Sequence, residues 1–252
     1  VQQMNLMYSG GEKLDLACTF GANGLYSAAA TTGKLLAIDE LLPEYGQGII
    51  DAVGEKFIYA PKVNGQLFGV PTVGAYGTGT AYYMRKDLVE KYQIDVETIK
   101  TLDDVGNVLK VIKDNEPDMV PLGMTAGTGP VVSWADYDAL GDRLGVLPGY
   151  DNDYKVVNLF ETDEYAEQVR RVNEWFIAGY INKDAATTTV VPDSQIKAGR
   201  TFSVIYPSSP GQELGIELSA GHDMVAVELA SPYTTTANVL TGLWTVAQHS
   251  EN

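Results

Sequence analysis

Residues 63–90, VNGQLFGVPTVGAYGTGTAYYMRKDLVE, constrain the fold of this 252-residue chain more than any other stretch. The pair Asn64-Gly65 tolerates positive backbone φ angles, so it predicts a tight type I′ turn between two short strands. Pro71 ends the second strand, a flexible run follows over 73–80, and residues 81–84 form a strand before a helix begins near Arg85. Strand and helix signals alternate in this way along the chain, which predicts an α/β protein.

Two helices carry clear start and stop signals. Thr101 is a good N-cap residue and Asp104 stands three positions later, which makes an approximate capping box for a helix that Pro117 ends. A second capped helix starts at Thr162 and closes at Gly179. We expect the buried face of this second helix to consist of Ala166, Val169, Val172 and Phe176.

Composition narrows the class of partner. The net charge of −16 repels nucleic acid and anionic lipid, so neither is an expected partner. No apolar run reaches the roughly 18 residues that a membrane span needs.

Cys18 is the single cysteine, which excludes an internal disulfide and predicts a small buried side chain. The chain begins Val1-Gln2 inside a helical pattern, so we expect a mature or trimmed piece of a longer protein.

The sequence lacks the residue patterns that are typical of metal sites and phosphate sites. His222, His249 and Cys18 cannot make a standard transition-metal cluster. The acidic turn 151–153 lacks the glycine and the closing glutamate of a calcium loop. Gly127-Thr128-Gly129 runs into proline, and the chain has no Gly-Lys-Ser/Thr motif. We therefore expect no metal and no cofactor.

Catalytic patterns are equally weak. The chain has no Gly-x-Ser-x-Gly motif for a serine nucleophile. A glycosidase needs two carboxylates, but Asp136 and Asp138 are two residues apart and would point to different faces of a helix. With 33 acidic residues, a tempting pair is expected by chance. We interpret these acids as solvated surface groups.

The aromatic residues favour a sugar ligand. The chain has 15 Tyr against 6 Phe, and both Tyr and Trp combine an apolar face with a polar edge. A sugar has matching features, because it presents a face of C–H groups and a rim of hydroxyls. Trp175 fits a helix core, whereas Trp134 follows a glycine- and proline-rich segment and is expected to reach solvent.

Several ordered phrases resemble a known family. VNG-x-x-x-GVPT, YYMRKDLVEKYQID and IKTLDDVGNVLKVIKDNEP are similar to extracellular solute-binding proteins of ABC importers, in particular the sugar-type family that includes maltose-binding protein and its Gram-positive lipoprotein branch. The resemblance implies a two-lobed α/β fold of the periplasmic-binding-protein type (type II) with a first lobe incomplete at both ends. The first lobe would comprise residues 1–82 plus 236–252, and the second residues 83–235.

The resemblance also implies a function. The protein would capture a mono- or oligosaccharide in an inter-lobe cleft, close by hinge motion and deliver the sugar to a membrane permease, without making or breaking bonds. It would be a monomer outside the cell, either periplasmic or anchored through a lipid-modified N-terminus that this chain lacks. Two alternatives stay open. One is a receptor for a peptide, amino acid or anion, for which Arg85, Arg143 and Arg200 are the candidate cations. The other is a carbohydrate hydrolase.

The expected ligand-binding residues lie at strand ends and crossing positions. Open α/β sheets place ligands beyond the carboxyl ends of their strands. The resemblance adds the aromatic segment of the second lobe and the return crossing. We expect ligand contacts from Phe20, Asn23, Tyr26, Thr72, Tyr76, Trp134, Tyr206, Ser208 and Trp244.

Overall fold

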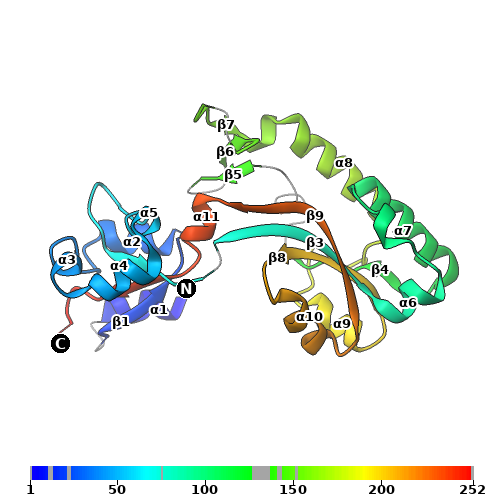
Figure 1. Cartoon of the computed structure of the whole chain (residues 1–252), viewed down its shortest axis with the longest axis horizontal. Coiled ribbons are helices and arrows are strands. Elements are labelled where there is room, and N and C mark those ends of the chain that lie inside the picture. Colours follow the sequence, from blue (N-terminus) through cyan, green and yellow to red (C-terminus); the bar gives the residue numbers. More distant parts are fainter. Residues whose placement is uncertain are drawn as a thin grey trace. The chain divides into compact units, whose positions relative to one another are not determined.

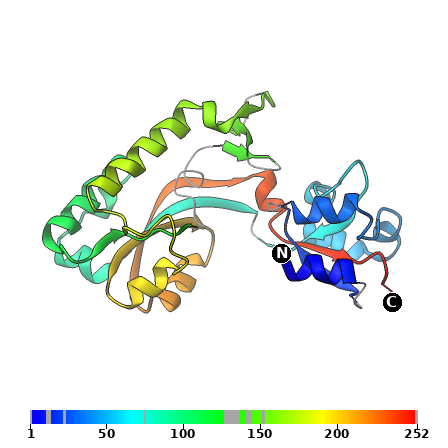
Figure 2. The same ribbon diagram turned by 180° about the vertical axis from the view of Figure 1, so that it is seen from behind.

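The computed structural model of the chain describes residues 2–10, 14–21, 24–74, 76–126, 137–140, 144–150 and 153–250. The chain divides into two compact units, which are drawn in Figures 1 and 2. Unit 1 consists of Val1–Tyr76, Tyr137–Leu159 and Thr234–Asn252, and unit 2 consists of Gly77–Asp136 and Phe160–Tyr233. Strands and helices alternate within both units, which confirms the predicted α/β class. None of the helices in the described residues combines the length and the hydropathy that a transmembrane span requires.

Short elements build unit 1. Its helices are α1 (Gln2–Gly10), α2 (Leu25–Thr31), α3 (Leu41–Tyr45), α4 (Gln47–Val53), α5 (Glu55–Ile58) and α11 (Thr236–Val239). Its strands are β1 (Leu16–Thr19), β2 (Gly69–Pro71), β5 (Tyr137–Ala139), β6 (Gly145–Pro148), β7 (Val157–Asn158) and β10 (Leu243–Val246). A 3₁₀ turn, η4 (Leu159–Glu161), stands at the boundary with unit 2.

Longer elements build unit 2. Its helices are α6 (Lys86–Lys91), α7 (Leu102–Asn115), α8 (Asp163–Ile177), α9 (Pro192–Lys197) and α10 (Gln212–Ala220), with the 3₁₀ turn η2 (Val96–Thr98). Its strands are β3 (Gly77–Arg85), β4 (Val120–Leu122), β8 (Thr201–Ser208) and β9 (Met224–Thr234), whose last residue belongs to unit 1.

The main sheet of unit 1 joins the two ends of the chain. Its strand order is β1-β10-β2, and β10 runs antiparallel to both neighbours. Trp244 is in register with Cys18 on one side and with Val70 on the other. This pairing confirms the prediction that the segment before residue 246 returns to the first lobe. One face of the sheet packs against α1 and α2 through Tyr8, Tyr26 and Leu243.

The predicted turn at Asn64-Gly65 is present. Both residues have positive φ angles, 51° and 83°. Val63 and Gln66 exchange backbone hydrogen bonds of 2.8 and 3.0 Å across the turn. The flanking segments form one isolated bridge here, rather than the two strands that the sequence predicts.

Unit 2 contains a four-stranded sheet in the order β4-β8-β3-β9, with β4 parallel and β3 antiparallel to β8. Side chains alternate between its two faces. Tyr82, Met84 and Phe202 pack with the apolar face of α7, whereas Tyr83 and Val204 pack toward α9 and α10. The sheet is therefore covered by helices on both faces, as the α/β pattern requires.

The first strand of this sheet is longer than predicted. The sequence predicts a flexible run over 73–80, but residues 77–80 belong to β3. Gly79 explains the difference, because a Cβ placed there would lie 2.4 Å from the Ala230 carbonyl oxygen and 2.7 Å from Ser208 Oγ. The glycines thus allow close strand packing instead of a loop.

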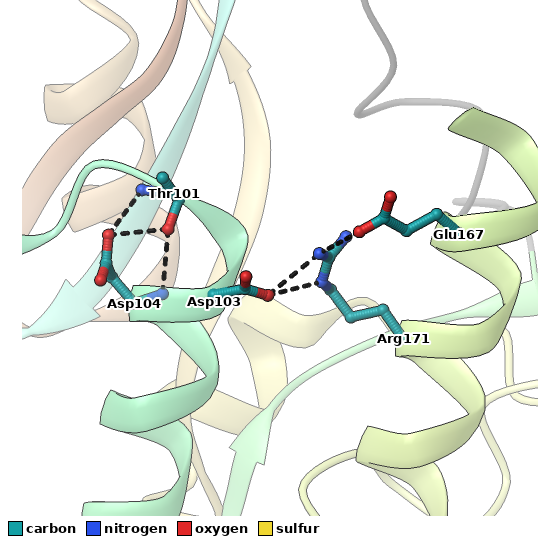
Figure 3. Close-up of polar contacts among 5 residues, drawn as sticks. All are labelled: Thr101, Asp103, Asp104, Glu167 and Arg171. Carbon is teal, nitrogen blue, oxygen red and sulfur yellow. Dashed lines mark hydrogen bonds and ion pairs between the residues drawn. The ribbon is translucent and has the colours of Figure 1, made fainter. Parts of the chain in front are cut away.

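Helix α7 begins with the predicted capping box (Figure 3). Thr101 Oγ1 accepts a hydrogen bond from the Asp104 amide at 3.2 Å, and Asp104 Oδ2 accepts one from the Thr101 amide at 2.9 Å. The Thr101 hydroxyl also donates to Asp104 Oδ2 at 2.8 Å. This bond first, and then those from the Lys100 and Thr101 amides, lower the pKa of the Asp104 carboxyl. Two backbone donors at the start of the helix are thereby satisfied within the sequence motif itself.

Helix α8 lies beside α7 with a different face inward from the one predicted. The predicted boundaries hold, since Thr162 caps the helix and Gly179 has a φ of 74°. However, Val169 and Phe176 are exposed, and Gln168 and Trp175 are buried instead. Trp175 sits against Gly106 of α7, where no side chain intervenes. The large indole thus sets the rotation of the helix.

An ion-pair group links the same two helices (Figure 3). Arg171 of α8 donates to Asp103 of α7 at 3.0 and 3.2 Å and to Glu167 at 2.9 Å. The arginine side chain is mostly covered while both carboxylates are solvated. The hydrocarbon part of the Arg171 side chain is therefore covered by the protein, while its guanidinium group reaches the two solvated carboxylates.

The observed units differ from the expected lobes in two longer segments, besides residues 234–235, which belong to unit 1. Residues 77–82 belong to unit 2, because β3 pairs with β8 from Gly79 to Met84. Residues 137–159 belong to unit 1, where they form the small sheet β5-β6-β7. The predicted lobes placed this segment with the rest of 83–235, and its contact with α11 is a tertiary feature with no local signal.

Candidate functional site

One edge of the unit 1 sheet collects several predicted ligand residues. Strands β1 and β2 are both antiparallel to β10, so their carboxyl ends meet at the same edge. Phe20 follows β1 and is exposed, and Thr72 follows β2. Two backbone hydrogen bonds of 2.9 Å join this edge to the segment before β10. The Gly21 amide donates to the Leu240 carbonyl, and the Thr72 amide donates to the Gly242 carbonyl. The structure therefore brings Phe20 and Thr72 to one rigid edge.

Tyr76 folds back onto this edge. Its hydroxyl donates to the Thr72 carbonyl at 2.9 Å, and its ring lies 4.9 Å from that of Phe57 in a tilted arrangement. Partial burial raises the pKa of the Tyr76 hydroxyl. The phenol thus keeps its lone pairs for accepting hydrogen bonds, while its proton is already donated.

Tyr26 lies in the core of unit 1 and not at its surface. The side chain is 3% exposed, and its hydroxyl donates to the Pro61 carbonyl at 2.7 Å and accepts from the Phe68 amide at 3.3 Å. Burial raises the pKa of Tyr26 to about 12. In the sequence this residue follows a strand end and a short loop, but α2 turns its ring inward. Tyr26 is therefore a packing residue that ties α2 to the 61–68 segment.

Trp244 lies on the face of this sheet that is opposite to Tyr26 and Leu243, in an apolar groove. The groove has a volume of about 560 Å³ and runs between the sheet and helices α3 and α4. Trp244 is 50% exposed and Leu16, on the neighbouring strand, is 62% exposed. Thr72 also lines the groove, together with Leu41, Tyr45, Ile49, Val70 and Val73. This lining offers stacking and apolar contact, and few hydrogen-bonding groups.

In unit 2 the carboxyl ends of the parallel strands β4 and β8 also meet at one edge. Ser208 ends β8 opposite Gly79, and Met124 and Thr125 follow β4. The buried amide of Asn182 holds the β4 end, accepting from the Met124 amide at 2.9 Å and donating to the Met124 carbonyl at 3.0 Å. The same amide donates to Asp184 at 2.8 Å and thereby lowers the pKa of that carboxyl.

The Tyr206 hydroxyl points away from that edge, toward α9. It donates to Asp193 Oδ1 at 2.9 Å, and Ser219 of α10 donates to the other carboxylate oxygen at 2.8 Å. Burial first, and then the neighbouring Asp193 carboxylate, raise the pKa of Tyr206. The three residues link the sheet to both helices on this face, so Tyr206 has a structural partner in addition to any ligand.

Two predicted residues, Asn23 and Trp134, lie outside the described residues. Sequence reasoning also missed Asn182 and Asp193, which fix the surroundings of the unit 2 edge. No local pattern marks either of them, because their partners are 58 and 13 residues away. Asn182 lies in the phrase GYINKD, which also resembles the solute-binding family and is the one sequence signal for this residue.

Two of the three candidate cations of an anion receptor, Arg85 and Arg200, are not at the unit 2 edge. Arg85 ends β3 and Arg200 precedes β8, and both positions are at the opposite end of the sheet because β3 is antiparallel to β8. Arg85 is also paired with Asp87 at 2.6 Å. Arg143 lies outside the described residues. Within the part of the chain that the structure describes, no group of three His, Cys, Asp or Glu side chains is placed to hold a metal ion.

Comparison with known proteins decides the family. Residues 2–227 match the family described as bacterial extracellular solute-binding proteins. The chain belongs to this family. It is also 28% identical, over 194 residues, to a carbohydrate ABC transporter substrate-binding protein of Streptococcus pneumoniae serotype 4 (strain ATCC BAA-334 / TIGR4). That alignment covers 77% of this chain and 38% of the relative.

Solved structures of this family confirm the predicted fold. The N-glycan transport solute binding protein (NgtS) of S. pneumoniae matches with a TM-score of 0.84 at 23% identity, covering 100% of this chain and 54% of that chain. Its complex with Man1GlcNAc matches with a TM-score of 0.82 at 22% identity and covers 55% of that chain. The chain therefore spans about half the length of these solved structures and 38% of the length of the S. pneumoniae relative.

Proposed function

We propose that this chain is the ligand-capturing component of a carbohydrate ABC importer. The observation that carries the proposal is family membership over residues 2–227, together with a relative that is named for carbohydrate transport. The unit 1 edge supports it, because it combines the exposed ring of Phe20 with the half-buried hydroxyl-bearing side chains of Thr72 and Tyr76, a combination that suits a neutral sugar. Following the resemblance, the protein binds a mono- or oligosaccharide by hinge closure, acts outside the cell as a monomer with periplasmic or lipid-anchored placement, passes the sugar to a permease and catalyses no reaction.

Within this proposal the ligand contacts come from Phe20, Thr72 and Ser208, with Asn23 and Trp134 as further contacts predicted from the sequence. Tyr76 contributes its ring face and its hydroxyl lone pairs, since its hydroxyl proton is already donated. Tyr206 contributes a ring face only, because its hydroxyl is turned toward Asp193 of α9. Trp244 contributes an exposed indole face. Tyr26 is left out because it is buried. The glycan-named relatives of this fold make Man1GlcNAc a suitable first probe.

Isothermal titration calorimetry of the 252-residue chain with Man1GlcNAc tests the proposal. We expect binding in the micromolar range, which corresponds to about −8 kcal/mol. An oligopeptide, a free amino acid and inorganic phosphate serve as probes for the three non-sugar ligand classes, which are peptides, amino acids and anions. The bound glycan should be recovered intact after incubation. Binding of the peptide, the amino acid or phosphate without binding of any neutral glycan would replace the proposal, and cleaved glycan would restore the hydrolase alternative.

The sharpest site test is Trp134→Ala. A stacked aromatic contributes about 2 kcal/mol in binding hot spots, so the affinity for the best sugar should fall roughly thirtyfold. The free energy of unfolding should change much less than the about 3–5 kcal/mol expected for a buried tryptophan. Trp175→Ala, at a buried position in α8, is the matched control with the opposite pattern. Unchanged affinity with a large loss of stability would move Trp134 from the site to the core.

A further inference from the structure

The small sheet β5-β6-β7 belongs to unit 1 although the chain enters and leaves it from unit 2. Its strands pair antiparallel, with Asp138 in register with Leu147 and Val146 in register with Val157. Val146 and Leu159 are fully buried, and the Leu159 amide donates to the Leu144 carbonyl at 2.9 Å. The segment is thus a folded element with its own packing, and its attachment to unit 1 needs a specific contact.

Asp138 provides that contact. Its two carboxylate oxygens accept the Thr236 amide at 3.1 and 3.2 Å, and Oδ2 also accepts the Thr236 hydroxyl at 3.0 Å. The two residues are 98 positions apart in the sequence. Hydrogen bonds to a carboxylate are stronger than those between neutral groups. The middle residue of β5 is therefore fastened to the first residue of α11.

The start of α11, which donates these hydrogen bonds to Asp138, has a helix cap of its own. Thr235 caps α11, because its hydroxyl accepts from the Asn238 amide at 3.2 Å and also bonds the Asn238 side chain. Helix α11 leads directly into β10, the central strand of the unit 1 sheet. Asp138 is thereby connected through one short helix to the core of unit 1.

We infer that Asp138 is a positioning residue that makes residues 137–159 move as part of unit 1. The chain then passes between the units at four places, 76/77, 136/137, 159/160 and 233/234, whereas the expected lobes have boundaries at two, 82/83 and 235/236. A relative motion of the units is absorbed at these four places. The small sheet β5-β6-β7 moves together with unit 1. The inference rests on the proposed function only where ligand is used to drive such a motion.

The contact is tested first without ligand, by amide hydrogen exchange. In Asp138→Ala the Thr236 amide loses its acceptor, so its exchange should become at least about tenfold faster, and the amides of β5 and β6 should follow. Thr236→Val removes the hydroxyl but keeps the amide and should have a smaller effect. Glu40→Ala is the matched control, because it removes an exposed acid of unit 1 that makes no helix-cap bond. Equal protection of Thr236 in Asp138→Ala and the control would overturn the inference.

The motion is tested by distances between spin labels in a Cys18→Ser background. Labels at Lys155 and Glu55 report the small sheet against the rest of unit 1, and labels at Lys155 and Lys100 report it against unit 2. We expect Man1GlcNAc to shift the second distance and leave the first unchanged, and Asp138→Ala to broaden the first. A ligand-driven shift of the first distance, or no broadening in Asp138→Ala, would contradict the inference. If no sugar shifts either distance, the proposed function fails, while the broadening still tests Asp138.

Discussion

The main sheets of the two units differ in how their faces are covered. In unit 2, α7 packs on one face and α9 and α10 on the other, so that Tyr82, Met84 and Phe202 are completely buried. In unit 1, α1 and α2 cover one face, but the face with Leu16 and Trp244 stays open over the α3/α4 groove. The sequence class is α/β in both units. The comparison shows that α/β alternation alone does not ensure two covered faces within these 252 residues.

The largest expected difference is in core truncation. Phe202→Ala in unit 2 should lower the free energy of unfolding by about 3–5 kcal/mol, because it leaves a cavity in a fully packed layer. Leu16→Ala on the open face of unit 1 should change it by less than about 0.5 kcal/mol. Urea denaturation followed by circular dichroism measures both. Similar losses in the two variants would mean that the Leu16 face is covered in solution.

Glycine substitutions sharpen the comparison at intermediate size. Gly79→Ala in β3 should cost about 1–3 kcal/mol, because the added carbon meets the Ala230 carbonyl. Gly69→Ala in β2 meets Thr245 and the Trp244 carbonyl at 2.8 and 2.9 Å, but its sheet has an open face and can shift. We expect a smaller loss there, measured by thermal unfolding.

A matched glycine separates steric effects from helix propensity. Gly215 lies within α10 and has open space where a Cβ would stand. Gly215→Ala should therefore stabilise the protein by up to about 1 kcal/mol. A loss for Gly215→Ala as large as that for Gly79→Ala would remove the steric explanation.

Helix caps give a smaller contrast. The capping box of α7 in unit 2 predicts that Thr101→Ala lowers the free energy of unfolding by about 1 kcal/mol. Helices α2 to α5 of unit 1 have no side-chain cap bond. Thr31→Ala, within α2 and exposed, is the control and should stay within about 0.5 kcal/mol. If both threonines behave alike in chemical denaturation, the cap geometry contributes nothing measurable.

The smallest effect depends on pH. The side chain of Arg85 donates to Asp87 at 2.6 and 3.0 Å, and this lowers the pKa of the Asp87 carboxyl below its ordinary value of 3.8. A depressed folded-state pKa adds stability above the ordinary value and loses it as the pH falls through the folded value. The stability difference between the protein and Asp87→Asn should therefore be constant above pH 3.8 and shrink below it. A difference that grows on acidification would contradict the pairing.

Local signals predicted local structure well. The Asn64-Gly65 turn, the Thr101 capping box and the Thr162 and Gly179 boundaries are each determined within a few neighbouring residues, and all are present. The return of residues 243–246 to the first sheet came from the family resemblance and is confirmed by pairing with β1 and β2. Patterns of this kind need no knowledge of distant partners.

Features set by distant contacts were missed. The buried face of α8 was predicted from the spacing of Val169 and Phe176, but the fit of Trp175 against Gly106 turns the helix. Tyr26 was predicted as a ligand residue, yet its hydroxyl finds partners at Pro61 and Phe68, about 40 residues on. For the other candidate site residues, the sequence could indicate strand ends but not which side chains were already engaged within the fold.

The open face of the unit 1 sheet has a consequence for heat capacity. The heat capacity change of unfolding arises mainly from apolar surface that becomes hydrated when the chain unfolds. Leu16, Trp244, Tyr45 and Val73 are already largely hydrated in the folded chain and add little to that change. Per residue, unit 1 should therefore unfold with a smaller heat capacity change than unit 2. Its stability then depends less steeply on temperature, and anything that covers the groove makes that dependence more curved.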